Sequence, residues 1–302
     1  MHFRAMALAC ALAAIPACSG TSDRPAPPDP AALNAAAREW RVKHEADYRR
    51  DWVSVAGLHP LQPGRNRAGS AAGNDIVLPA SAPATLGIFE LTGERVRFEP
   101  ASSVGVLLNG EPVTAARDLR DDSQRAADEL VAGDVRLIVH VSGGKRSIRV
   151  RDPGGPLAKA FAGFAWFPID SQYRVAGRFV GDPEPRRLKV VNTYGDVDEY
   201  TTEGVVEFQL LGETLRLRPF TTRPGRLYFV FRDASSGQET YDTARFLYAD
   251  LQPDGTVVLD FNIAYNPPCA FNPYTTCPIP LRENRLPVKV LAGEKAYVPR
   301  TE

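Results

Sequence analysis

Residues 260–295 read DFNIAYNPPCAFNPYTTCPIPLRENRLPVKVLAGEK and contain six prolines and four asparagines. Each proline removes a backbone donor and disfavours the helical region for the residue before it. The stretch therefore cannot be a regular helix or a central strand. We expect an irregular terminal loop, rich in side-chain amides, that closes the end of a β-rich unit.

The chain begins with the three parts of an export signal. Arg4 provides a short basic region, residues 5–15 are apolar, and Ala17 is a small residue at the processing position. The apolar run is too short to span a bilayer. We therefore expect a cleaved signal peptide over residues 1–17.

The residues around the processing position suggest a lipid anchor. Ile15-Pro16-Ala17-Cys18 resembles the lipobox of bacterial lipoproteins, in which the cysteine is acylated and becomes the first residue of the mature chain. Because Ser19 follows Cys18, the resemblance implies the periplasmic face of the outer membrane. An ordinary secretory signal with an incidental cysteine is the alternative.

Export also bears on the remaining cysteines. Of the four in the chain, Cys10 falls in the signal peptide and Cys18 is assigned to lipid. Cys269 and Cys277 are left in a compartment that favours disulfides, and we predict that they bond to each other and pin the terminal loop. A metal or redox role is the alternative, although zinc usually takes four nitrogen or sulfur ligands.

The overall charge argues against nucleic acid as a partner. The chain has 36 basic and 36 acidic residues, so its formal net charge is zero. No net field would draw in nucleic acid or an anionic membrane surface. The only membrane contact that we expect is through the lipid anchor.

A tether and one helix follow the signal. Residues 18–30 are mostly small, polar or proline, which is typical of a flexible linker. Asp29 before Pro30 is a helix-start signal, and we expect a helix through about Arg50. Its apolar and aromatic stripe consists of Leu33, Ala37, Trp40, His44 and Tyr48. We expect His44 to be packed in this stripe rather than to act as a ligand or base.

The rest of the chain has short alternating runs separated by glycine-containing turns, which predict antiparallel β-structure. Asn109-Gly110 is a strong hairpin signal, and Ser142-Gly143-Gly144 joins two further β-rich runs. Residues 226–232 are apolar on both faces, as in a strand covered on both sides. Residues 163–169 also read as a strand.

We predict a mainly β fold with two packed antiparallel β-sandwich or barrel units and one N-terminal helix. The breaker cluster at residues 152–156 marks the boundary. The first unit with its helix is expected to span residues 31–152. The second unit, with the terminal loop, is expected to span residues 153–302.

The candidate ligand-binding residues come from the terminal loop and the strands that lead into it. Arg245 offers a planar fork for a carboxylate or phosphate, and asparagines offer paired donors and acceptors. The predicted set consists of Tyr241, Arg245, Asp260, Asn262, Tyr265, Asn266 and Asn284. It contains no nucleophile, so no catalytic residue is assigned.

Three interpretations of this set stay open. The first is a binding lipoprotein that holds a small polar ligand, a glycan or a partner segment. The second is a hydrolase-like envelope enzyme with Asp260 as general base. The third is a structural plug, in which Arg245 and Asp260 form a buried pair and the asparagines bond the free carbonyls of the loop.

Several familiar sites are missing from the sequence. It has no Gly-x-Ser-x-Gly elbow, no His-Glu-x-x-His helix, no P-loop and no dinucleotide fingerprint. Beyond the signal, the histidines are His44, His59 and His140, and they are scattered. We therefore predict no metal site and no cofactor.

Part of the first unit is similar in spacing to forkhead-associated β-sandwiches, which bind phosphothreonine. The similarity lies in residues 67–70, residues 74–79 and Asn109-Gly110. That family has an arginine where this chain has Ser70, and the histidine of its Ser-x-x-His signature is replaced by Ala84. The resemblance implies the sandwich shape, but a phosphate would lack its charge-assisted partners.

A second resemblance covers most of the chain after the tether. Residues 52–58, residues 163–168 and above all the terminal stretch, with Asn266-Pro267-Pro268-Cys269, Cys277-Pro278 and residues 292–295, resemble domain of unknown function family 1684. This family occurs in bacteria and haloarchaea. The resemblance implies one shared architecture with the terminal loop as its signature, and it implies no reaction, substrate or cofactor.

Overall fold

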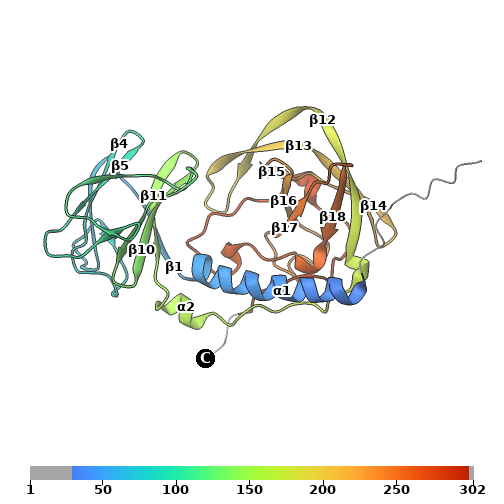
Figure 1. The fold of residues 1–302 in the computed structure, drawn as a ribbon, viewed down its shortest axis with the longest axis horizontal. Helices are drawn as coiled ribbons and strands as arrows, with labels where there is room; N and C mark the ends of the chain where they lie inside the picture. The colour runs from blue at the N-terminus through green and yellow to red at the C-terminus, as the bar shows by residue number, and fades with distance from the viewer. Residues whose placement is uncertain (1–28, 299–302) are drawn as a thin grey trace, which may run out of the picture.

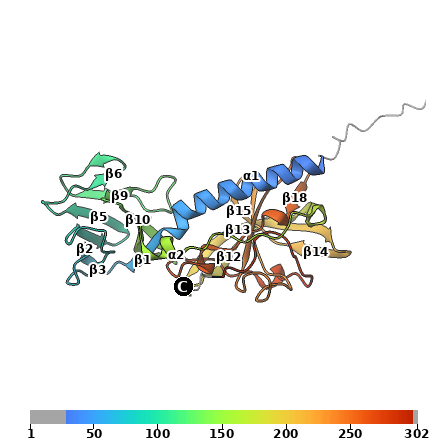
Figure 2. The ribbon, with the colours of Figure 1, turned by 90° about the horizontal axis from the view of Figure 1, so that it is seen from below.

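The computed structural model describes residues 29–298 and shows two β-rich units beside one long helix (Figure 1). Helix α1 (Pro30–Tyr48) runs along the second unit and ends next to the first (Figure 2). The predicted mainly β fold with one N-terminal helix is confirmed. The predicted signal peptide, Cys18 and most of the tether lie outside the described residues.

The first unit consists of two sheets. One has the order β1-β11-β10-β9-β6-β7 and the other the order β3-β2-β4-β5-β8. The strands are β1 (Val55–Pro60), β2 (Gly64–Gly69), β3 (Ile76–Val77), β4 (Gly87–Thr92), β5 (Arg95–Pro100), β6 (Leu107–Leu108), β7 (Glu111–Pro112), β8 (Arg117–Leu119), β9 (Glu129–Ala132), β10 (Val135–Ser142) and β11 (Lys145–Arg151).

Strand β5 illustrates how alternation builds this core. Its arginines face solvent while Val96 and Phe98 are buried, because successive side chains of a strand point to opposite faces. Phe98 pairs across the strands with Phe89, and their ring centroids are 4.9 Å apart. Burial of one such ring stabilises the fold by about 1.5–3 kcal/mol.

Both predicted turns of this unit form. Asn109 and Gly110 have φ values of 52° and 90° and connect β6 to β7. Gly143 and Gly144 have φ values of 54° and 76° and connect β10 to β11. Glycine and asparagine accept these left-handed conformations with little steric cost.

The second unit contains a four-stranded sheet in the order β14-β13-β12-β18 and a three-stranded sheet in the order β15-β16-β17. Its strands are β12 (Arg174–Val191), β13 (Val197–Leu210), β14 (Glu213–Leu217), β15 (Phe220–Arg223), β16 (Arg226–Phe231), β17 (Arg245–Asp250) and β18 (Thr256–Asp260). Strand β16 is covered on both faces as predicted. Phe229 packs into one hydrophobic cluster and Val230 into another.

Helix α1 begins where the sequence predicts. The Asp29 carboxylate accepts a hydrogen bond from Ala31 N at 3.1 Å, and Pro30 occupies the first turn. The α-helix ends at Tyr48 and continues as a π-helical turn, η1 (Arg49–Val53). The remaining helical segments are short: α2 (Pro156–Ala160), η2 (Ser171–Tyr173), η3 (Phe261–Ile263), η4 (Pro268–Ala270) and η5 (Arg282–Asn284).

The predicted strand over residues 163–169 does not form. The segment makes one isolated bridge, from Trp166 to Glu294. Its aromatic side chains pack against α1 instead, and Trp166 lies edge-on to Trp40 with 6.2 Å between ring centroids. The high aromatic content that suggested a strand therefore comes from a helix-packing segment.

Within residues 29–298, no helix combines the length and the apolar character needed to cross a bilayer.

Candidate functional site

The terminal loop is held in place by buried asparagines. Asn284 is fully buried, accepts from Arg218 N at 2.8 Å, and donates to the carbonyls of Arg218 and Val230 at 2.8 and 2.9 Å. Asn266 is also fully buried and donates to Glu294 at 2.9 Å. Two of the predicted ligand-binding residues are therefore internal cross-links of the loop.

Glu294 is the buried acid of this network. Asn266 donates to its carboxylate from both the backbone, at 2.8 Å, and the side chain. Burial raises the pKa of Glu294 to about 8, although both bonds from Asn266 act to lower it. The carboxyl is sealed inside the loop and lines no hollow beside α1.

Arg245 is another predicted residue that the fold encloses. Its guanidinium is fully buried, pairs with Asp233 at 2.8 Å, and donates to the carbonyls of Val290 and Ala292. Its partner is thus Asp233 and not Asp260. Tyr241 lies apart from this pair and donates to the carbonyl of Cys269 at 3.2 Å. The fold uses both side chains to hold the terminal loop.

The other three predicted residues line a depression that we call the α1 groove. It consists of two adjoining hollows of about 460 and 300 Å³, which share Arg174 and Asp260. Tyr265 lines the larger hollow and Asn262 the smaller one. The larger hollow is lined by Trp40, His44, Arg174, Arg226, Tyr248, Ala249, Asp250, Gln252, Val258, Asp260, Ile263 and Tyr265.

Two ion pairs define the charge of the larger hollow. Arg174 pairs with Asp260 at 2.6 Å, and Arg226 pairs with Asp250 at 2.9 Å. The lining therefore contains two guanidinium groups and two carboxylates, and its formal charge is zero. Asp260 also accepts two hydrogen bonds from Asn262, at 3.1 and 3.0 Å, which fix the carboxylate on the groove wall.

Aromatic side chains provide the apolar part of the same hollow. Trp40 and His44 stack with ring centroids 4.5 Å apart and an interplanar angle of 12°. The His44 ring also contacts Tyr265, with a centroid distance of 4.4 Å. On the far wall, the Arg226 guanidinium lies over the Tyr248 ring at 5.0 Å. The hollow thus combines flat apolar faces with paired charges.

His44 is packed in the aromatic stripe, as its helical spacing predicts. Burial lowers its pKa to about 4, so the imidazole is neutral at pH 7. Its buried Nε2 has no hydrogen-bond partner among the described residues. An unsatisfied buried nitrogen costs about 1–3 kcal/mol, so this wall of the groove is not optimised for stability.

The sequence predicts one wall of the groove and not the other. Asp260, Asn262 and Tyr265 were predicted because they belong to the unusual loop. Arg174 and Arg226 begin strands β12 and β16, far from the loop in sequence, and no local pattern distinguishes them from other strand arginines. The apolar and aromatic stripe of α1 is the sequence feature from which the position of Trp40, facing the terminal loop, could have been predicted.

The predicted disulfide is not present in the structure. Cys269 and Cys277 are both free thiols, and Cys269 N donates to Cys277 Sγ at 3.4 Å. A hydrogen bond from Cys277 lowers the pKa of the Cys269 thiol, while burial raises that of Cys277. The two sulfur groups are therefore neighbours linked by hydrogen bonding instead of a covalent bond. No metal-binding cluster occurs among residues 29–298.

Comparisons with known proteins address the family. The model described as Protein of unknown function (DUF1684) matches residues 159–295. An uncharacterized protein of Haloarcula marismortui with a solution NMR structure is 32% identical, over 48% of this chain and 82% of that one, with a TM-score of 0.39. No curated protein matches the chain.

Forkhead-associated domains of known structure align over a smaller share of the chain. The second such domain of a Mycobacterium tuberculosis ABC transporter is 28% identical over 30% of this chain and 77% of that one, with a TM-score of 0.23. A forkhead-associated domain studied for phosphothreonine-dependent interactions is 19% identical, over 31% of this chain and 92% of that one, with a TM-score of 0.22.

Proposed function

Since the chain belongs to the family described as Protein of unknown function (DUF1684), its function has to be inferred from its own groove, and we propose that the α1 groove binds a neutral, polyhydroxylated ligand such as a short glycan segment. The observation that carries the proposal is the pairing of charges in the larger hollow. Two Arg–Asp pairs flank an aromatic surface there and leave no net charge.

Charge balance selects against ionic ligands. An anion near Arg226 would also lie near Asp250, because the two groups are 2.9 Å apart, and a cation would meet the converse problem. A hydroxyl both donates and accepts, so it can bond the carboxylate and the guanidinium of one pair. Ligands with several hydroxyls suit two such pairs in one hollow.

The aromatic walls supply the rest of the affinity. A sugar ring presents C–H groups on its faces, and these pack on flat aromatic side chains through dispersion. Trp40 and Tyr248 are both partly exposed in the larger hollow, so their rings remain available. A hollow of about 460 Å³ lies within the usual range for small-molecule sites.

We further propose that this binding takes place in the cell envelope. The export signal and the lipobox-like residues ending at Cys18 support a lipid-anchored protein on the periplasmic side of the outer membrane. In that oxidising compartment, the neighbouring thiols of Cys269 and Cys277 would close into a disulfide.

A thermal-shift panel tests the proposal, because a ligand that binds only the native state raises its apparent stability. Neutral oligosaccharides such as chitotriose and maltotriose are compared with the anionic trigalacturonate. We expect a saturable rise in melting temperature with a neutral sugar and none with trigalacturonate. No response to any neutral sugar, or a stronger response to trigalacturonate, would reject the proposal.

One substitution makes the charge argument sharper. Asp250→Asn leaves Arg226 unneutralised in the groove, and Asp250 is exposed enough for the variant to fold. We expect weaker binding of the neutral sugar and new binding of trigalacturonate. Tyr274→Ala, which removes an exposed aromatic ring outside the groove, is the matched control and should change neither.

A further inference from the structure

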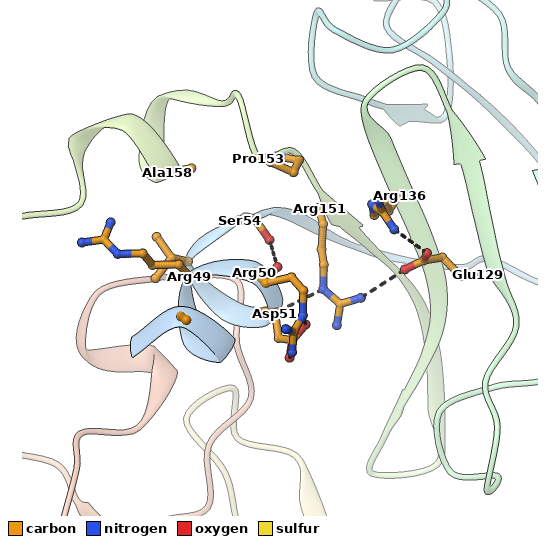
Figure 3. Close-up of a pocket in the computed structure, with 11 residues that line it drawn as sticks. Arg49, Arg50, Asp51, Ser54, Glu129, Arg136, Arg151, Pro153 and Ala158 are labelled. Carbon is orange, nitrogen blue, oxygen red and sulfur yellow. Dashed lines mark hydrogen bonds and ion pairs between the residues drawn. The ribbon is translucent and has the colours of Figure 1, made fainter. Parts of the chain in front are cut away.

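A second hollow, the junction cavity, lies where the first unit joins the end of α1. It measures about 630 Å³ and is lined by the π-helical turn η1, by strands β9 to β11, and by Pro153 and Ala158 beyond them (Figure 3). It shares no lining residue with the α1 groove. A ligand bound in it would therefore not occupy the proposed glycan site.

Arginines dominate the lining of the junction cavity. Four line it, at positions 49, 50, 136 and 151, together with two acids, Asp51 and Glu129. Glu45 and Asp47 pair with Arg49 and Arg50 from outside the lining. With them included, the acids are four and equal the arginines in number. Net charge alone therefore does not define the site, and the hydrogen bonds of each guanidinium decide what it can bind.

Two of the four arginines are committed elsewhere. Arg50 uses all three side-chain nitrogens on Asp47 and Asp51, with distances of 2.7–3.0 Å. Arg49 pairs with Glu45 at 2.8 Å and lies over the Phe161 ring at 4.6 Å. Each side-chain nitrogen of Arg50 thus has a carboxylate partner, and the Arg49 side chain points away from Arg151 and Glu129 (Figure 3).

Arg151 is different because its end groups are not hydrogen-bonded. Its Nε donates to the Asp51 carbonyl at 2.9 Å, but neither terminal nitrogen has a hydrogen-bond partner among residues 29–298. The nearest carboxylate oxygen, on Glu129, is 3.8 Å from Nη1. Figure 3 shows this guanidinium between the η1 turn and Glu129. Burial lowers the Arg151 pKa, while the charges of Asp51, Glu129 and Asp122 act to raise it.

Arg136 lies on the other side of the same carboxylate. Its Nη1 donates to Glu129 at 2.9 Å, and its two other nitrogens have no bond in the described chain. Arg136 and Arg151 therefore converge on Glu129 with four uncommitted nitrogens between them. The π-helical turn that holds Arg151 is a type of backbone irregularity often found at functional sites.

We propose that the junction cavity binds a small oxyanion ligand, a phosphate monoester or a carboxylate, between Arg136 and Arg151. The planar guanidinium fork bonds two oxygens of either group at once. Glu129 opposes this binding by repulsion and competes for the same donors. A bound oxyanion would tie the first unit to the η1 turn through Arg151.

Inorganic phosphate and succinate are the probes, each titrated calorimetrically against a sodium chloride control of equal ionic strength. Saturable binding of one probe above the salt control supports the site, and the better probe identifies the ligand class. Arg151→Gln and Arg136→Gln should each weaken binding about tenfold, the effect of one lost charge-assisted hydrogen bond.

Substitution of Glu129 distinguishes a ligand-binding cavity from a purely structural cluster. Glu129→Gln should bind the probe several-fold more tightly, a result that a purely structural role of Glu129 would not produce. Arg216→Gln, in the exposed Arg216–Glu207 pair on the second unit, is the matched control. Absence of saturable binding, unchanged affinity in Arg136→Gln, or no tightening in Glu129→Gln would overturn the proposal. The exposed position of Arg136 keeps the test valid if Arg151→Gln does not fold.

Discussion

At the scale of single residues, Arg245 is predicted from the sequence to bind a ligand, but the fold encloses its side chain. It is a fully buried cation whose neutralising partner, Asp233, is equally buried. Removing one member of such a pair leaves an uncompensated charge in the core and typically costs about 3–5 kcal/mol. Burial of this kind argues for a structural role.

Arg245→Ala should therefore lower the free energy of unfolding by about 3–5 kcal/mol, measured by urea denaturation. Arg216→Ala is the control, because Arg216 belongs to an exposed pair that is worth less than about 1 kcal/mol. Equal, small effects of the two substitutions would contradict the structural role of Arg245.

His44 gives a pH prediction. Its pKa is about 4 in the folded chain and near 6.5 when unfolded, so between these values the unfolded state binds more protons. Stability should fall as pH drops through 6.5 and level off below 4, by up to about 3 kcal/mol. His44→Phe keeps a ring in the stripe and should remove that part of the loss. Unfolding curves at pH 7 and 4 measure the difference; identical pH slopes would refute it.

At the scale of elements, the terminal loop is the least regular and most tightly bonded segment. Cys269 and Cys277 are adjacent in it, with a 3.4 Å bond from the Cys269 amide to the Cys277 sulfur. Under oxidising conditions we expect a disulfide. Thiol titration of the unfolded, unreduced protein should find neither cysteine, whereas the reduced protein should show both. Two reactive thiols in the oxidised sample would exclude the bond.

Three elements with strong local signals were predicted correctly. Asp29-Pro30 begins α1, Asn109-Gly110 forms its hairpin, and strand β16 is covered on both faces, since each outcome depends on neighbouring residues. The site was only partly predicted, because the residues of its other half come together only through tertiary packing. Arg174 meets Asp260 across 86 residues of chain, and no local pattern encodes that pairing.

At the scale of the whole molecule, the two β units and α1 place two different hollows on one chain. The larger hollow of the α1 groove is balanced in charge and aromatic, whereas the junction cavity contains guanidinium donors with no hydrogen bond in the described chain. Because their lining residues do not overlap, ligands of the two sites should not compete for the same space. The same protein could then hold a glycan while a separate oxyanion occupies the junction.

Attachment to the envelope is also a property of the whole chain. If Cys18 carries lipid, the protein should appear in the membrane fraction and incorporate labelled palmitate when expressed in a bacterium. Cys18→Ser should abolish the label, while Cys10→Ser should not, because Cys10 lies within the predicted signal. Label retained in Cys18→Ser would contradict the anchor.

The central claim, that the α1 groove binds a neutral glycan, is tested most directly by the fluorescence of Trp40. The chain has three tryptophans, and Trp52→Phe with Trp166→Phe leaves Trp40 as the only reporter. Titration with the neutral sugar that raises the melting temperature should change its emission saturably, because the sugar packs against this ring. A sugar that raises the melting temperature while Trp40 emission stays constant would place binding elsewhere and contradict the account.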